Sequence, residues 1–347
     1  MIMLWLPAAV SLLLSSSLHV AGDAGGGVAS LSVRRYDAIF SFGDSLADTG
    51  NNPVVFDCRT PGPAVGAAVL GLQRELPARR QLRRRRRHRT RLQLLPRRRR
   101  SPGRQPVPSQ HQPKRAAELV RFTQALTLQH NSSDAECKDF FGRSLFFVGE
   151  FGINDYHSSF GRRSMQEIRS FVPDIIRTIS MAVEKLIGDG ATTVVVPGMI
   201  PSGCSPPVLV TFADAGAAEY DASTGCLREP NEVATLHNSL LLDAVEELRE
   251  KHPDVAIMHT DLFRHVSEMV QNPDKFGFQK DVLSVCCGGP GKYHYNTRII
   301  CGDEGATTCV DPSKSLYWDG VHLTEAAYHY IADDWLHAIT LSARATS

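Results

Sequence analysis

The chain carries, two residues after Ala38, the stretch Phe40-Ser41-Phe42-Gly43-Asp44-Ser45-Leu46-Ala47-Asp48-Thr49-Gly50-Asn51. The apolar residues 38–40 predict a short buried strand, and the Asp, Thr, Gly and Asn residues that end the stretch are typical of turns and helix N-caps. Ser45 would then lie where a strand turns into a helix, with its hydroxyl clear of the sheet and its N–H beside those of the first helical turn. This geometry suits a nucleophile, because the N–H donors can hold the oxyanion that it creates. Taken alone, the pattern is more often an ordinary turn in which Ser45 caps a helix.

A segment near the other end of the chain could supply a base. It reads Tyr-Trp-Asp-Gly-Val-His-Leu-Thr over residues 317–324 and places Asp319 three residues before His322. Both side chains can lie on one turn, with the carboxylate holding one imidazole nitrogen and the other nitrogen turned toward a nucleophile. Thr324 is expected to cap a following helix. Taken alone, Asp-x-x-His also fits a surface ion pair.

A third segment, Gly-Glu-Phe-Gly-Ile-Asn-Asp-Tyr at residues 149–156, follows the strand-like residues 145–148. The side-chain amide of Asn154 could donate a hydrogen bond to an oxyanion there. The alternative is a glycine-rich turn without a chemical role.

These segments, in this order, resemble the GDSL or SGNH ester hydrolases, and specifically their large secreted plant branch. The similarity extends to VVVPGMIPSGCSP at 194–206 and CCGGPGKYHYN at 286–296, and covers residues 36–57 and about 131–340. It implies an α/β, flavodoxin-like SGNH-hydrolase fold, three layers (α/β/α) with a mainly parallel central sheet. It also implies a carboxylic ester hydrolase that acts on a small ester or lipid, needs no cofactor or metal and is a monomer.

The resemblance also assigns roles to residues. Ser45 is the expected nucleophile, His322 the base and Asp319 its orienting acid, while the Ser45 N–H and Asn154 are two of three oxyanion donors. The third donor in the family is a glycine N–H between the first and third segments, and we find no such glycine in this sequence.

The beginning of the chain predicts secretion. Residues 1–22 have an apolar centre and end in small residues, as signal peptides do. Eight cysteines fit an oxidising compartment, and Asn131 begins a glycosylation sequon. We therefore expect an extracellular protein without a transmembrane segment, in which residues 31–347 form a single domain.

Residues 58–130 do not fit that domain. From residue 76 to residue 117 there are 16 Lys and Arg and no Asp or Glu; removing these 16 from the 38 basic residues leaves 22 against 37 acidic ones, a net charge of −15. Nucleic-acid binding is disfavoured, because no aromatic residue lies between residues 57 and 120 to stack on bases. We expect this Arg/Pro-rich segment to be disordered, since a run of arginines cannot be buried without partners.

A shift of the reading frame explains the composition better. Arginine codons of the CGN type read one nucleotide out of frame become Gly, Ala and Val codons. Residues 79–89 can be encoded by codons whose shifted frame reads GANFAVGAATA, and residues 107–118 by codons whose shifted frame reads FPLNTSLSVQLN. Both strings resemble the family's segment between its first and third motifs. Our hypothesis is a splice-model error or a true frameshift, and the alternative function is then a catalytically impaired or inactive product that lacks the oxyanion glycine.

The remaining sequence alternates two hydrophobic periods. Strands are expected at Leu145–Val148, Thr192–Val196 and Val255–His259, and helices at Ser164–Ile187 and Asn231–Lys251, which argues for a parallel sheet covered on both faces.

The cysteines suggest local bridges. Cys204 with Cys226 and Cys301 with Cys309 are the expected pairs, and the adjacent Cys286 and Cys287 are left open. The resemblance implies that Cys137 has lost its partner and that Cys58 belongs to the aberrant segment.

Overall fold

The computed structural model describes residues 36–43, 134–216 and 219–345. Four predictions lie outside these ranges: the signal peptide at residues 1–22, the nucleophile Ser45, the Arg-rich segment 58–130 and the sequon at Asn131.

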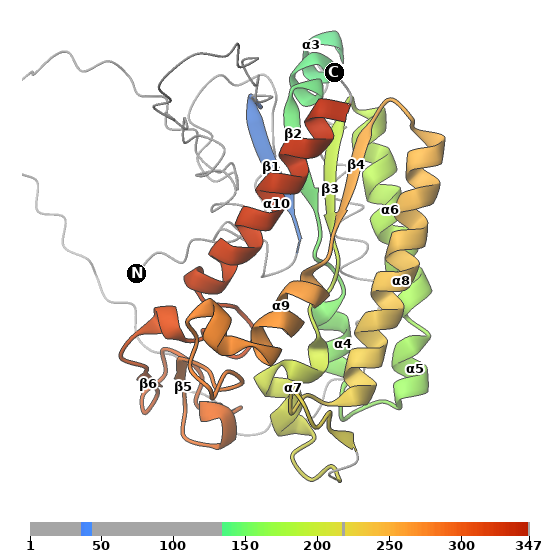
Figure 1. The fold of residues 1–347 in the computed structure, drawn as a ribbon. Coiled ribbons are helices and arrows are strands. Elements are labelled where there is room, and N and C mark those ends of the chain that lie inside the picture. Colours follow the sequence, from blue (N-terminus) through green and yellow to red (C-terminus); the bar gives the residue numbers. More distant parts are fainter. Residues whose placement is uncertain (1–35, 44–133, 217–218, 346–347) are drawn as a thin grey trace, which may run out of the picture.

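A four-stranded parallel sheet forms the centre of the described residues (Figure 1). Its order is β1-β2-β3-β4, and the strands are β1 Ala38–Phe42, β2 Ser144–Val148, β3 Thr193–Pro197 and β4 Ala256–Thr260. Every residue of β1, β2 and β3 is buried, as expected for strands covered on both faces, which read as near-continuous apolar runs. The four strands predicted from the sequence are confirmed.

Helices cover both faces of the sheet. In Figure 1, α6 (Val172–Gly188) and α8 (Arg228–Lys251) pack side by side on one face, and α10 (Glu325–Ala345) crosses the other, with α9 (Leu262–Gln271) beside it. The shorter helices are α3 Asp134–Gly142, α4 Ile153–Ser159, α5 Met165–Arg169 and α7 Pro206–Thr211. The arrangement is the predicted three-layer α/β/α architecture.

Short elements fill the connections. They are the 3₁₀ turns Ser202–Cys204, Pro273–Phe276, Lys292–His294 and Pro312–Lys314, and the antiparallel pair β5 Cys287–Gly288 and β6 Thr307–Thr308. Among the described residues, we find no helix with the length and apolarity needed to span a bilayer.

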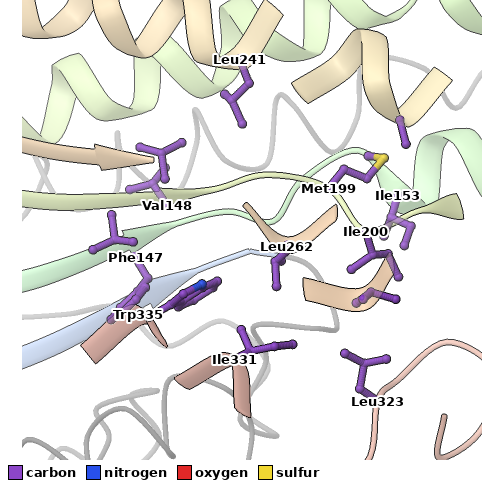
Figure 2. Close-up of a cluster of buried hydrophobic side chains, with 14 of the residues drawn as sticks. Phe147, Val148, Ile153, Met199, Ile200, Leu241, Leu262, Leu323, Ile331 and Trp335 are labelled. Carbon is purple, nitrogen blue, oxygen red and sulfur yellow. The ribbon is translucent and has the colours of Figure 1, made fainter. Parts of the chain in front are cut away.

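The core has one apolar layer on each side of the sheet (Figure 2). On the α10 side, Trp335 stacks on Phe147 with ring centroids 5.8 Å apart. On the other side, Phe40 stacks on Phe146 at 4.9 Å, and Leu241 of α8 packs toward Val148. Alternate residues of β2 therefore join both helical layers to the sheet.

The prediction of one continuous helix from Ser164 to Ile187 is wrong, because the structure has two helices there. The pattern from Ser164 to Ile187 forms α5 and α6, with a break at residues 170 and 171. Ser164 starts α5 through reciprocal hydrogen bonds with Glu167. Pro173 then lies in the first turn of α6, where its missing N–H costs nothing but where it cannot continue the preceding helix.

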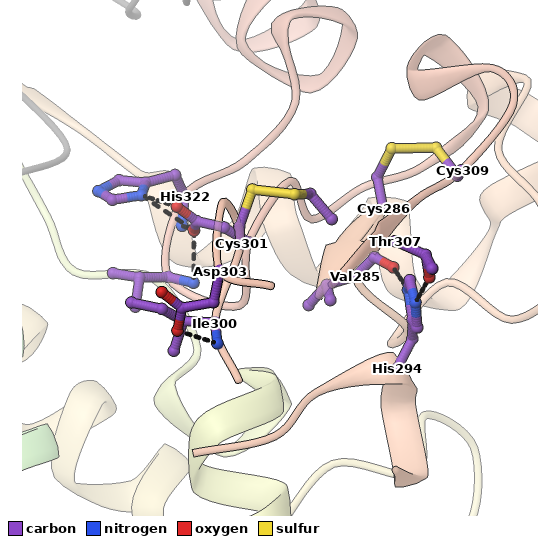
Figure 3. The surroundings of a disulfide bond; sticks show 12 residues. Val285, Cys286, His294, Ile300, Cys301, Asp303, Thr307, Cys309 and His322 are labelled. Atoms are coloured by element: carbon purple, nitrogen blue, oxygen red, sulfur yellow. Dashed lines mark hydrogen bonds and ion pairs between the residues drawn. A yellow bond between two sulfur atoms is a disulfide. The ribbon is translucent and has the colours of Figure 1, made fainter. Parts of the chain in front are cut away.

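The predicted Cys301–Cys309 bridge is also wrong. Cys286 bonds to Cys309 and Cys287 to Cys301, so both members of the adjacent pair are bridged (Figure 3). The cause is the β5–β6 pairing. Next to it, the N–H of Cys309 donates to the carbonyl of Cys286 at 2.7 Å, which brings the sulfurs of these two cysteines together.

The other two cysteine predictions have opposite outcomes. The Cys204–Cys226 bridge is confirmed. The expectation that Cys137 is unpaired is wrong, since its sulfur is disulfide-bonded.

Candidate active site

The segments that follow β1 and β2 leave the sheet side by side. Phe42 is in register with Val148, and the N–H of Gly149 donates to the Phe42 carbonyl at 2.7 Å. Parallel α/β sheets bind their ligands at this carboxyl edge of the strands. Gly43 is the last described residue after β1, and Ser45 follows it by two residues outside the described ranges.

Asp319 and His322 form a hydrogen-bonded pair before α10. Nδ1 of His322 lies 2.9 Å from Oδ1 and 2.8 Å from Oδ2 of Asp319. Oδ1 also accepts the backbone N–H of Val321 at 3.1 Å and that of His322 at 2.9 Å. One carboxylate therefore shapes the turn and orients the His322 ring, and the predicted one-turn arrangement of Asp-x-x-His is present.

The surroundings keep Asp319 ionised. Burial alone would raise its pKa, but the hydrogen bond to His322, the attraction of that ring, and the two backbone donors together lower the pKa below the ordinary value. The two side chains are 24% and 17% exposed, and Nε2 of His322 is buried. An oriented imidazole beside a carboxylate is chemically suited to accept a proton at Nε2.

Short backbone contacts hold this turn in place. The N–H of Trp318 donates to the His322 carbonyl at 2.8 Å, and the N–H groups of Cys286 and Cys287 donate to the carbonyls of Tyr317 and Trp318 at 2.9 and 2.7 Å. The turn with Asp319 and His322 is therefore hydrogen-bonded to the segment that contains the disulfide-bonded Cys286 and Cys287.

Gly320 and Tyr295 pack together beside the pair. Gly320 has a φ of +95°, and a Cβ built on it would lie 2.8 Å from the Tyr295 ring, so no other residue fits without displacing that ring. Burial and the negative charge of Asp319 raise the pKa of Tyr295. The sequence analysis did not single out Tyr295, although it lies within one of the segments that carry the family resemblance.

Asn154 lies in the first turn of α4, which follows β2 after a connection at residues 149–152. Gly152, with a φ of +103°, starts the helix without a side-chain cap. Asn154 is half-buried, and its side-chain amide has no hydrogen-bond partner within the described part of the chain. Ile153 and Leu323, the chain neighbours of Asn154 and His322, belong to one buried cluster with Ile200 (Figure 2).

Comparison with known proteins gives a consistent result. The family model described as GDSL-like Lipase/Acylhydrolase matches residues 39–335. GDSL esterase/lipase At1g28600 of Arabidopsis thaliana is 40% identical over 206 residues, which are 59% of this chain and 52% of the relative. A protein named sinapine esterase from Brassica napus is 38% identical over 218 residues, 62% of this chain and 56% of its own length.

The chain thus spans about half the length of the curated relatives it matches. The family match, in contrast, runs from β1 into α10 and takes in the parallel sheet and the Asp319–His322 turn. The chain therefore belongs to the GDSL-like lipase/acylhydrolase family, and its parallel α/β architecture is the SGNH-hydrolase fold.

Proposed function

We propose that the protein is a serine carboxylester hydrolase that works through Ser45, His322 and Asp319. The observation that carries the proposal is the contact between Asp319 and Nδ1 of His322, which leaves Nε2 as the basic atom of the ring. The position of Ser45 in the chain supports the proposal. Ser45 is two residues after Gly43, which lies at the carboxyl edge of the sheet, so the Cα atoms of Gly43 and Ser45 are at most about 7.6 Å apart.

The reaction has two half-steps. Nε2 of His322 takes the hydroxyl proton of Ser45 while the oxygen attacks the ester carbonyl carbon, and the resulting oxyanion is held by the Ser45 N–H and the Asn154 amide. The carbon–oxygen bond to the leaving alcohol then breaks, and the alcohol takes the proton from His322. A water molecule, deprotonated by His322, then attacks the acyl carbon. The bond from that carbon to Oγ of Ser45 breaks, Ser45 takes the proton back from His322, and the acid is released.

The substrate is proposed to be a small ester or lipid. The name of the Brassica napus relative indicates an ester of a phenolic acid, which keeps this class among the candidates. We propose that the protein is secreted, on the basis of the signal-like residues 1–22 and the sequon at Asn131. We also propose that residues 31–347 form a single catalytic domain and, from the family resemblance, that the protein is a monomer.

Substitution of the three proposed catalytic residues tests the mechanism. Ser45→Ala and His322→Ala should each lower kcat for p-nitrophenyl butyrate by about 10⁴-fold or more, and Asp319→Asn by a similar order, because it holds the imidazole in the wrong tautomer. Circular dichroism should show an unchanged fold.

Ser313→Ala, an exposed serine in the same C-terminal region, is the matched control and should leave kcat unchanged. Retention of most of the turnover by Ser45→Ala would show that another group is the nucleophile.

A further inference from the structure

A buried polar pair joins α4 to α8. The hydroxyl of Tyr156 lies 3.0 Å from Nδ1 of His237, 81 residues away, and the two rings are nearly perpendicular, with centroids 5.9 Å apart. Tyr156 is 0% and His237 1% exposed. Neither side chain has a place in the proposed reaction, and polar groups this deeply buried persist when they are hydrogen-bonded to each other.

Both groups are neutral. Burial lowers the pKa of His237 to about 3, with the nearby His259 adding to the effect. Burial also raises the pKa of the Tyr156 hydroxyl, and the charges of Asp155 and Glu150 act in the same direction. The hydrogen bond therefore keeps one protonation state over the whole pH range in which esters are assayed.

The pair lies against the start of the helix that carries Asn154. A Cβ built on Gly152 would lie 3.3 Å from the Tyr156 ring, 3.5 Å from the His237 ring and 3.2 Å from Ile175. The N–H of Tyr156 also donates to the Gly152 carbonyl at 3.0 Å. The first turn of α4 is thus enclosed by its own tyrosine and by two neighbouring helices.

The stability of α4 depends on these tertiary contacts. With 7 residues it is far shorter than the about 12–15 residues at which isolated helices become marginally stable, and Gly152 gives it no side-chain cap. Tyr156 follows Asn154 by two residues in the same turn. A rotation of the turn about its axis would therefore redirect the Asn154 amide as well.

Asn238, the residue after His237 in α8, binds the segment that follows β3 at the same edge of the sheet. Asn238 accepts the N–H of Met199 at 2.6 Å and donates to its carbonyl at 3.0 Å. Residues 237 and 238 of this 24-residue helix thus contact both the segment after β2 and the segment after β3.

We infer that His237 and Tyr156 are positioning residues that set the direction of the Asn154 amide toward the oxyanion. This inference rests on the proposed function. An oxyanion donor acts only when its distance to the developing charge is right, and a misplacement of about 1 Å can cost 10²-fold in rate. The effect therefore belongs to the chemical step and not to ground-state binding.

A double-mutant cycle tests the inference. Tyr156→Phe, which keeps the ring and removes the hydroxyl, should lower kcat for p-nitrophenyl butyrate by about 10-fold and leave KM unchanged. In an Asn154→Ala background, the same change should alter kcat by less than about 2-fold, because the group that it positions is gone. His237→Gln, which can still accept the hydroxyl hydrogen bond, should retain more activity than His237→Leu.

Tyr330→Phe is the matched control. This change removes the hydroxyl of a tyrosine on α10, which donates to the Phe276 carbonyl at 3.2 Å. We expect kcat not to change. Amide hydrogen exchange should be faster in the first turn of α4 in Tyr156→Phe, and unchanged there in Tyr330→Phe.

Independent losses for Tyr156→Phe and Asn154→Ala, or a rise in KM alone, would overturn the positioning role while leaving the hydrolase intact. Absence of Ser45-dependent hydrolysis in the unmodified chain would instead refute the proposed function, and the positioning role with it. If Tyr156→Phe does not fold, the His237→Gln and His237→Leu pair in the two backgrounds decides between the same outcomes.

Discussion

At the scale of single residues, His237 makes the stability of the fold depend on pH. Its pKa is lowered from 6.5 to about 3, chiefly by burial. Between these values the unfolded chain binds a proton that the folded chain does not, so the free energy of unfolding falls as the pH falls through this window. The slope from this group is at most about 1.4 kcal/mol per pH unit.

His237→Gln should therefore flatten the pH dependence between pH 6.5 and pH 4. Urea unfolding at several pH values measures it, and some slope should remain because burial also lowers the pKa of His157 to about 4. An unchanged slope in His237→Gln would mean that this histidine is already protonated in the folded chain.

The sequence predicted contacts between residues that are close in the chain. Asp319 and His322 are three residues apart, so a single turn brings them together and the spacing alone was sufficient. Tyr156 and His237 meet only because α4 and α8 pack against each other, and no local pattern encodes that contact. The hydroxyl position of Ser45 remains a prediction.

At the scale of elements, α8 supports the loop after β3 through its amide side chains. Asn238→Ala would leave the N–H and the carbonyl of Met199, a fully buried residue, without their side-chain partner. We expect a loss of about 1–3 kcal/mol in the free energy of unfolding. Chemical denaturation followed by circular dichroism gives this value.

Thr235→Ala is the comparison variant on the same helix, because its exposed hydroxyl donates to the Asn231 carbonyl at 2.9 Å within α8 and has no other hydrogen bond to the described residues. A cost for Asn238→Ala no greater than that for Thr235→Ala would show that the loop does not depend on the Asn238 amide.

The strands were predicted from the sequence, and the break between α5 and α6 was missed. A strand buried on both faces is a short apolar run between turn residues, and β2 and β3 both have this form. The apolar stripe through Ile168, Phe171 and Ile175 continues across the break, so hydrophobic periodicity masks it. Pro173 was the available signal, and the periodicity outweighed it.

At the scale of the whole molecule, the chain combines a basic segment with an acidic remainder. The hypothesis of a shifted reading frame predicts that the oxyanion hole of the chain as given lacks one donor. Its kcat should then be about 10²- to 10³-fold lower than that of a frame-repaired version, with a smaller change in KM.

Parallel assays of both purified proteins on p-nitrophenyl butyrate make this comparison. Equal kcat values for two well-folded preparations would mean that a residue within 58–130 supplies the donor. A cDNA that encodes the arginine run in frame would separately exclude an annotation error.

The bridges Cys286–Cys309 and Cys287–Cys301 are nested, one loop inside the other. Arg298 is exposed within the inner loop, where a trypsin-like protease could cleave after it. The two pieces would stay joined by both bridges, so the cut would add the mass of one water and release no fragment. A molecule cleaved there would keep its Asp319–His322 turn on the same covalent frame and separate only after reduction.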